Sequence, residues 1–172
     1  AMYLAGMVAD GSQMNKRQLN AWARGASWYM ISEYTVPGVA AESPHARALA
    51  LKWMDAKKES VAACGWCTYA GVVATQSDED LDLDEIKQLL QRVADEIDDA
   101  PNRVRYCMNG FVISVGSYVK PLLKEAKAVA RQIGKVEVDV GDTACKVPLA
   151  TDYIAKVEEM NRVGKKRKTM KC

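Results

Sequence analysis

Two arginines at the start of a predicted helix are the residues in this sequence that most need a chemical partner. Arg103 and Arg105 follow Pro101, which marks a helix start. Positive charge in the first turn of a helix opposes the helix dipole, and a bound anion would compensate it. The sequence therefore predicts either a phosphate clamp at this position or an ion pair with the acidic residues Asp98 and Asp99 just before the helix.

The tryptophans have two interpretations. Trp22 and Trp28 lie on one predicted helix, and Trp66 lies on the helix after next. If successive helices present them on one concave face, they form an aromatic lining that suits the sugars and bases of a nucleic acid. The alternative is that each tryptophan fills space between packed helices. Glu33, four residues after Tyr29, is the carboxylate on the first of these helices.

Cys64 and Cys67 have the C-x-x-C spacing of a thiol redox pair, which needs a thiol at a helix N-terminus to lower its pKa. Here the motif lies inside one apolar helical run with no strand pattern before it, so we expect buried and inert thiols. Zinc would need two more thiolates, and Cys107 and Cys145 do not form a second such pair. The single His45 excludes sites with two histidine ligands. We therefore expect neither a metal nor a cofactor.

The formal net charge of +2 hides an uneven distribution. Residues 77–99 carry ten acids and two cations, a net charge of −8, so the rest of the chain carries +10. The acidic stretch is typical of a solvated loop and an outer helix face. The last eleven residues hold six cations and no acid, among them Lys165, Lys166 and Arg167. This basic tail is either a solvated terminus or a nucleic-acid contact.

Apolar residues spaced three and four apart predict helices along nearly the whole chain. The clearest spans Leu83–Ile97, with acids in its first turn. Ser43 and Thr151 are the expected N-caps of two further helices, and Pro37 with Gly38 should end an early one. The predicted helices cover residues 1–9, 15–34, 43–57, 60–76, 83–97, 101–117, 120–134 and 151–163.

Residues 135–147 break this pattern, because Val136, Val138 and Val140 alternate with acids in the period of a strand. A single strand has no partner among helices, so we expect an extended segment that lies across them. Helices of this length joined in pairs by short turns predict an all-α, HEAT/armadillo-like stack with one concave face. A closed helical bundle is the alternative.

Length and composition define the class of protein. A chain of 172 residues that is 49% apolar and 27% charged fits one globular domain, residues 1–172. It has no apolar run long enough to span a membrane and no signal peptide. Five cysteines without a secretory signal favour a reducing compartment. We expect a cytoplasmic monomer that makes no membrane contact.

Five segments also carry a family resemblance. They are MYLAG at 2–6, LNAW at 19–22, LALKW at 49–53, APNRVR at 100–105 and GKKRKT at 164–169. On these segments the chain resembles the AlkD-type DNA alkylation repair proteins of the HEAT-like repeat DNA glycosylase superfamily, and it resembles a divergent subgroup most. The resemblance covers most of the chain. It also implies a start upstream of Ala1, with further helices.

The resemblance implies excision of alkylated, cationic purines from double-stranded DNA. In the family an aspartate one turn after a tryptophan stabilises the developing oxocarbenium ion, and an arginine of a following helix holds phosphate. In this sequence Ala26 and Ser32 stand four residues after Trp22 and Trp28, and no arginine lies in the helix after Trp53. The catalytic motif is therefore incomplete, and DNA binding is expected more firmly than excision.

The sequence supports one leading hypothesis and one alternative. The first is a DNA alkylation repair family protein that binds alkylated duplex DNA in a basic and aromatic groove and, if it is active as a glycosylase, uses Glu33 as its catalytic carboxylate. The alternative is an inactive HEAT-like scaffold that binds nucleic acid, a protein or a peptide. The expected nucleic-acid contacts are Trp22, Trp28, Trp66, Arg103, Arg105, Lys165, Lys166 and Arg167.

Overall fold

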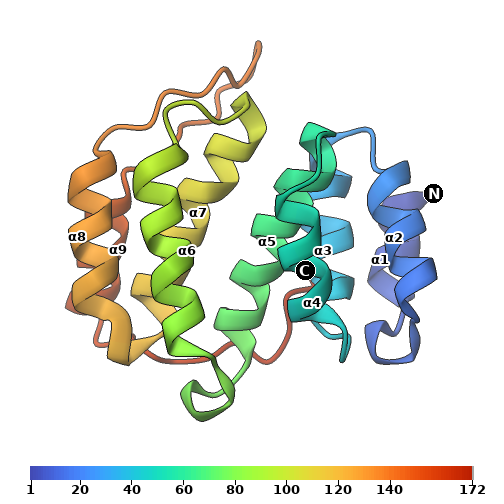
Figure 1. Ribbon diagram of the computed structural model, residues 1–172, viewed down its shortest axis with the longest axis horizontal. Coiled ribbons are helices and arrows are strands. Elements are labelled where there is room, and N and C mark those ends of the chain that lie inside the picture. Colours follow the sequence, from blue (N-terminus) through green and yellow to red (C-terminus); the bar gives the residue numbers. More distant parts are fainter. Residues whose placement is uncertain (172) are drawn as a thin grey trace.

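The computed structural model describes residues 1–171, and in that part of the chain every regular element is helical. The helices follow one another along an open stack, with the N-terminus at one end and α8 and α9 at the other (Figure 1). The predicted HEAT-like all-α architecture is confirmed, and the closed bundle is not observed. The α-helices are α1 (Met2–Val8), α2 (Lys16–Gly25), α3 (Val36–Ala40), α4 (Ala46–Met54), α5 (Glu59–Thr75), α6 (Leu83–Glu96), α7 (Asn102–Tyr118), α8 (Leu123–Ile133) and α9 (Ala150–Glu159).

Helix α5 is the centre of the stack and takes part in two cores. Val61 and Cys64 pack in the N-terminal core with α2, α3 and α4, whereas Trp66 and Tyr69 pack in the larger C-terminal core with α6 to α9. Burial on all sides explains why the α5 sequence is almost uniformly apolar. At Gly65 the two helices α4 and α5 approach so closely that a Cβ atom would lie 2.5 Å from the Met54 backbone nitrogen.

Local signals explain most helix boundaries. Asn15 and Gln18 form a reciprocal capping box at the start of α2, and the Asp82 side chain caps α6 by accepting from the Glu85 N–H. Gly134, with a φ of 54°, ends α8. Two predicted caps are wrong. Helix α4 begins at Ala46, after Ser43, and α9 begins at Ala150, so Thr151 lies inside its first turn.

The predicted helix over residues 15–34 is also wrong. Helix α2 ends at Gly25, and a new helical segment contains the π-helical turn η2 (Ile31–Thr35), followed directly by α3. Pro37 therefore lies near the start of α3 and does not end a helix. In the π-helical turn before it, the Val36 N–H donates to the carbonyl of Ile31, five residues earlier, instead of the carbonyl four residues earlier as in an α-helix. This change of hydrogen-bond partners accommodates Pro37, which has no backbone N–H.

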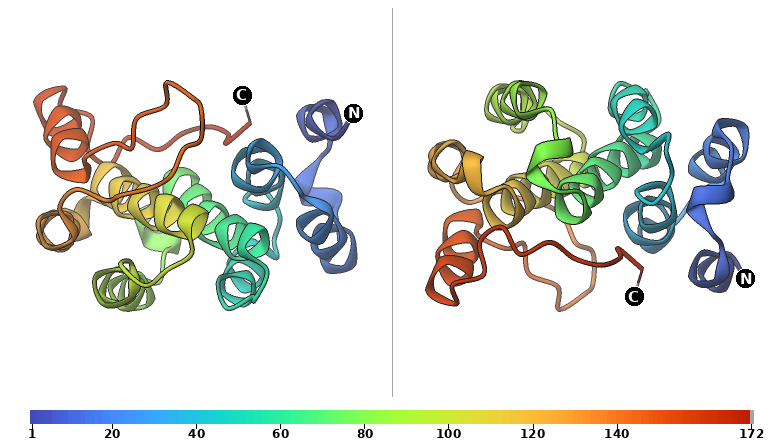
Figure 2. Two further views of the ribbon diagram at one scale, coloured as in Figure 1. Left: turned by 90° about the horizontal axis from the view of Figure 1, so that it is seen from above. Right: turned by 90° about the horizontal axis from the view of Figure 1, so that it is seen from below.

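The valine-rich segment, which we call the extended segment (residues 134–149), is confirmed as an extended connection without a strand partner. It runs from α8 to α9 and passes over the start of α7 (Figure 2). Val136 is buried in the C-terminal core, and Val138 packs against it. Asn102 fixes the middle of the segment, because its side chain donates to the Asp139 carbonyl and accepts from the Asp139 N–H at 2.7 Å each.

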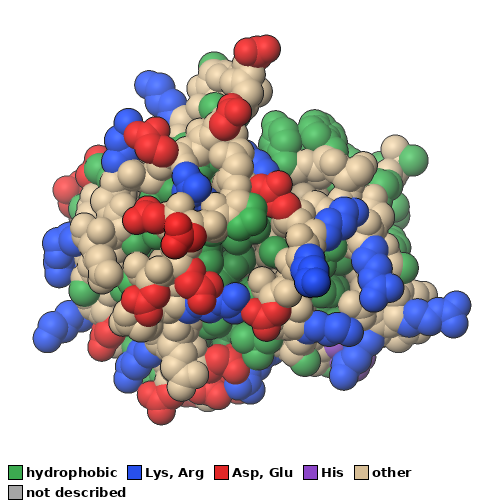
Figure 3. Space-filling view, turned by 45° about the horizontal axis from the view of Figure 1, so that its top comes forward, with side chains coloured by type: hydrophobic (Ala, Val, Ile, Leu, Met, Phe, Trp, Pro, Cys, Tyr) green, Lys and Arg blue, Asp and Glu red, His purple; other side chains and the backbone are tan. Residues whose placement is uncertain are grey.

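The two long sides of the stack differ in what covers them. Helices α2, α4 and α6 lie along one side, and the extended segment and the C-terminal residues lie along the other (Figure 2). Charge is divided along the first side as well. Acidic side chains gather over α6, and lysines and arginines gather towards α2 and α4 (Figure 3).

Candidate nucleic-acid interface

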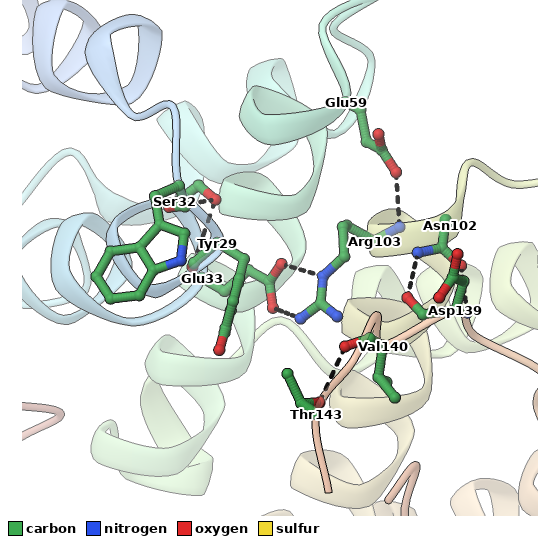
Figure 4. A network of polar contacts seen from close by, with 10 residues as sticks. Tyr29, Ser32, Glu33, Glu59, Asn102, Arg103, Asp139, Val140 and Thr143 are labelled. Carbon is green, nitrogen blue, oxygen red and sulfur yellow. Dashed lines mark hydrogen bonds and ion pairs between the residues drawn. The ribbon is translucent and has the colours of Figure 1, made fainter. Parts of the chain in front are cut away.

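Glu33 and Arg103 form a buried ion pair at the centre of the candidate site (Figure 4). Glu33 lies on the π-helical turn and is only 5% exposed. The Arg103 Nε donates to Oε1 at 2.7 Å, and Nη2 donates to Oε2 at 2.5 Å. This is the paired geometry in which a guanidinium binds a carboxylate most strongly. In this conformation neither Glu33 oxygen is free to face a sugar ring.

Two aromatic rings lie close to the Arg103 guanidinium. Its guanidinium carbon lies 4.8 Å from the centre of the Tyr29 ring and 4.6 Å from that of Tyr106. The backbone N–H of Arg103 donates to the Glu59 side chain at 2.6 Å, so a second carboxylate caps the start of α7. The anion predicted for this helix start is therefore Glu33, 70 residues earlier, rather than Asp98 or Asp99.

Burial and pairing together shift the pKa values of these two side chains. Desolvation raises the pKa of Glu33 above its ordinary value, although the hydrogen bonds and charge of Arg103 act in the opposite direction. The hydrogen bond to Glu33 raises the pKa of Arg103, which therefore stays charged. The free-energy cost of burying the Glu33 carboxylate is offset only while the Arg103 guanidinium remains paired with it.

Arg105 has a structural role that the prediction of a phosphate clamp missed. Its guanidinium donates to the Glu137 carbonyl at 2.9 Å, to the Ala100 carbonyl at 3.1 Å and to the Asp98 carbonyl at 3.2 Å. These bonds join the start of α7 to the end of α6 and to the extended segment. The guanidinium that was predicted to hold phosphate is thus engaged by main-chain oxygens in this structure.

The three candidate tryptophans separate into different environments. Trp28 is 56% exposed and meets the edge of Tyr29 at 5.6 Å between ring centres, beside the ion pair. Trp22 lines another cavity, between α1 and η2. Trp66 is wrong as a contact residue, because it is 0% exposed and packs against Phe111 in the core.

Two cavities open on the side of the stack that carries the extended segment, and they share Tyr34 and Tyr106. One has a volume of about 220 Å³ and reaches Tyr29 and Arg103, and the other has a volume of about 330 Å³. Tyr34 is 45% exposed and was not a predicted site residue. We call this joined space the tyrosine groove. Its further lining residues include Glu33, Cys67, Cys107, Ser114, Asp139, Val140, Thr143, Cys145, Arg167 and Met170.

The predicted basic tail is docked along the groove as a strap, residues 164–171. It begins where the Gly164 N–H donates to the Ser117 carbonyl at 2.9 Å. Lys166 pairs with Asp78 at 2.7 Å, and Lys171 pairs with Glu42 at 2.8 Å. These two lysines are anchors within the fold, although Lys166 was predicted as a nucleic-acid contact. The strap cations Lys165, Arg167 and Lys168 stay exposed.

The C-x-x-C motif lies within α5, as expected. Cys64 is fully buried, and burial raises the pKa of its thiol well above the ordinary value. Cys67 differs from the expectation, because it is partly exposed and lines the tyrosine groove. Among residues 1–171 no three histidine, cysteine, aspartate or glutamate side chains gather in a way that could hold a metal ion.

Comparison with known proteins identifies the family. No family model matches the chain. An uncharacterised protein of Listeria innocua is 31% identical over 165 residues, which cover 95% of this chain and 69% of that protein. An uncharacterised protein of Listeria monocytogenes is 29% identical over 163 residues, with 94% and 69% covered.

A solved structure shows the family of this chain. It represents a new family of proteins related to the HEAT-like repeat DNA glycosylases with affinity for branched DNA structures. It is 32% identical, and it superposes with a TM-score of 0.90 over 97% of this chain and 71% of its own. The chain belongs to this HEAT-like glycosylase-related family. The resemblance to a divergent subgroup of the glycosylase superfamily is thereby confirmed.

The sequence predicts part of the site of this HEAT-like protein. It named Glu33, Arg103 and Trp28, which the structure brings together with Tyr29, but it assigned Arg103 to phosphate. Tyr34 was not predicted as a site residue, although its position directly after Glu33 in the sequence could have indicated it. None of the helices in the described part of the chain is long and apolar enough to cross a membrane.

Proposed function

We propose that this protein binds DNA through the tyrosine groove and prefers branched to linear DNA. The observation that carries this proposal is the aromatic set of Tyr29, Tyr34 and Tyr106, which line one groove, with the exposed Trp28 packed against Tyr29. Aromatic side chains stack on bases that are not enclosed in a duplex, whatever their sequence. A branch point is where DNA offers such bases. The related protein with affinity for branched DNA structures supports the same conclusion.

Cations beside the groove supply the contacts with phosphate. Arg167 lines the larger cavity, and Lys165 and Lys168 are exposed on the same strap. No carboxylate in the described chain lies within 4.0 Å of these three side chains. Phosphate contacts of this kind give affinity without sequence preference and make binding depend steeply on salt.

Excision of alkylated purines fits the geometry less well than binding. A carboxylate that stabilises an oxocarbenium ion must face the sugar with its negative charge. Both oxygens of Glu33 already bind Arg103, which neutralises that charge. Incubation with duplex DNA that carries alkylated purines tests this point, and we expect no abasic sites. Abasic sites that disappear in Glu33→Gln would contradict it.

The alternative of a protein-binding or peptide-binding scaffold requires a mainly apolar or acidic groove. The lining of the tyrosine groove is largely apolar, and its two cations, Arg103 and Arg167, are balanced by the carboxylates Glu33 and Asp139, so the lining alone does not separate a scaffold from a DNA-binding groove. Affinity for a three-way junction and for a linear duplex of the same composition separates the two functions. Binding of neither DNA would remove the proposal and favour the scaffold.

Tyr34→Ala tests the role of the groove itself. Loss of one stacked base costs about 1–3 kcal/mol, so we expect junction affinity to fall at least about fivefold. Tyr153→Ala is the matched control, because Tyr153 is a similarly exposed tyrosine on α9. Equal junction affinity of the two variants would exclude the groove as the contact surface.

A further inference from the structure

A second surface of the protein carries concentrated positive charge that the tyrosine groove does not use. It lies on the outer side of α2 and α4 and in the turn between α4 and α5. All six of its cations are exposed, and none lies within 4.0 Å of a carboxylate in the described part of the chain. We call it the basic face. It consists of Lys16, Arg17, Arg24, Lys52, Lys57 and Lys58.

Contacts between α2 and the α4 region bring these cations together. Lys16, Arg17 and Arg24 lie on one stripe of α2, and Asn20 lies within the same stripe. The Trp53 indole N–H donates to the Asn20 side chain at 2.9 Å, next to Lys52 in the sequence.

At the other end of α2, the Lys58 ammonium donates to the Arg24 carbonyl at 2.6 Å. The lysines and arginines on this part of the surface gather in one region (Figure 3). The basic face is therefore one continuous patch rather than scattered charges.

The acids of this region are all committed to other cations. Between Gly11 and Lys58 the only acids are Glu33, Glu42 and Asp55. They pair with Arg103, Lys171 and Arg92, none of which belongs to the basic face. Asp10 and Glu59 flank this span, and neither forms an ion pair with a cation of the basic face in the described part of the chain. Six like charges without ion-pair partners repel one another, and a bound polyanion would relieve that repulsion.

The basic face and the tyrosine groove lie on different sides of the molecule. The groove is bordered by the extended segment and the strap, whereas α2 and α4 lie along the opposite side of the stack (Figure 2). A straight duplex cannot reach both surfaces, because the persistence length of DNA is about 150 bp. A branched molecule can, since its arms leave the branch point in different directions.

We propose that the basic face binds the phosphate backbone of a second duplex arm when the branch point of a DNA junction occupies the tyrosine groove. This inference rests on the proposed function and extends it, because it assigns the preference for branched DNA to a second contact surface. The partner is a duplex DNA arm, recognised by its phosphates and not by its bases.

The test uses the triple variant Arg17→Gln, Lys52→Gln, Lys57→Gln. These three side chains make no hydrogen bond or ion pair with the residues that the structure describes, so the fold is retained. The matched control is Lys124→Gln, Arg131→Gln, Lys156→Gln, which removes three exposed cations from α8 and α9. Affinities for a three-way junction and for a linear duplex are measured at several salt concentrations.

We expect the basic-face variant to lose junction affinity while its linear-duplex affinity stays at the wild-type value. Each lost phosphate contact lowers the salt dependence of log K by about 0.9, or about 2.7 for three contacts. Between about 50 and 200 mM salt, wild-type junction affinity should therefore fall about 40-fold more than that of the variant. The control variant should behave as the wild type.

Two results would overturn the inference. One is unchanged junction affinity in the basic-face variant, and the other is an equal loss for junction and linear DNA. Failure of the proposed function is seen in the wild-type protein itself, which would then bind neither DNA or bind both with equal affinity.

Discussion

The Glu33–Arg103 pair allows a sharp test of how the groove is held together. Arg103→Met removes the cation but keeps a long apolar side chain between Tyr29 and Tyr106. Glu33 then remains as a buried carboxylate, with only 2% of its side chain exposed and without its main partner. Removing one member of a buried pair costs about 3–5 kcal/mol.

The expected loss lies near the lower end of that range, about 3 kcal/mol, because the Arg103 side chain is 22% exposed and water reaches part of the site. For a chain of this size the loss corresponds to a decrease in Tm of about 6–12 °C. Glu33→Gln in the same protein should restore most of the stability, since it removes the buried charge. Thermal unfolding of the wild type, the two single variants and the double variant measures these changes.

The pH dependence gives an independent check. Burial raises the pKa of Glu33, so the folded state binds its proton more tightly than the unfolded state does. Stability therefore falls as pH rises from the ordinary carboxyl range through the raised pKa, and stays low above it. Without Arg103 that decrease should be larger. Additive single-variant effects, or a loss in Arg103→Met that does not change with pH, would refute this reasoning.

Three further predictions concern the surrounding fold. Gly65→Ala should destabilise the protein by about 1–3 kcal/mol in chemical denaturation, because the new Cβ atom would meet the α4 backbone. Trp66→Ala should cost about 3–5 kcal/mol of unfolding free energy, since this side chain is fully buried; a loss of DNA affinity without a loss of stability would contradict the core assignment. In native protein a thiol reagent should modify the exposed Cys145 quickly and Cys64 only after unfolding; rapid modification of Cys64 would revive the redox alternative.

The helices with a clear apolar stripe were predictable from the sequence. Helix α6 has apolar residues on one side and acids in its first turn, and its observed bounds differ from the prediction by one residue at its C-terminal end. The break after Gly25 was not predictable in this way. The π-helical turn and Pro37 give no periodic signal, and packing against α5 decides the backbone there.

The residue types of the candidate site were predictable from the sequence, but the contacts between its side chains were not. Arg103 and Glu33 were both singled out, but their contact spans 70 residues and joins the π-helical turn to α7. The basic tail shows the same limit. A run of lysines does not reveal that Lys166 and Lys171 face inwards to Asp78 and Glu42. Trp66 had a usable signal, since it lies in the uniformly apolar α5 sequence.

The most direct test of DNA binding by this protein is its affinity for a three-way junction and a linear duplex of equal composition, measured over a range of salt concentrations. The structure predicts tighter binding to the junction, with both affinities falling steeply as salt increases. Equal affinity for the two DNAs would contradict the preference for branched DNA. No binding, or a response that does not change with salt, would contradict DNA binding itself.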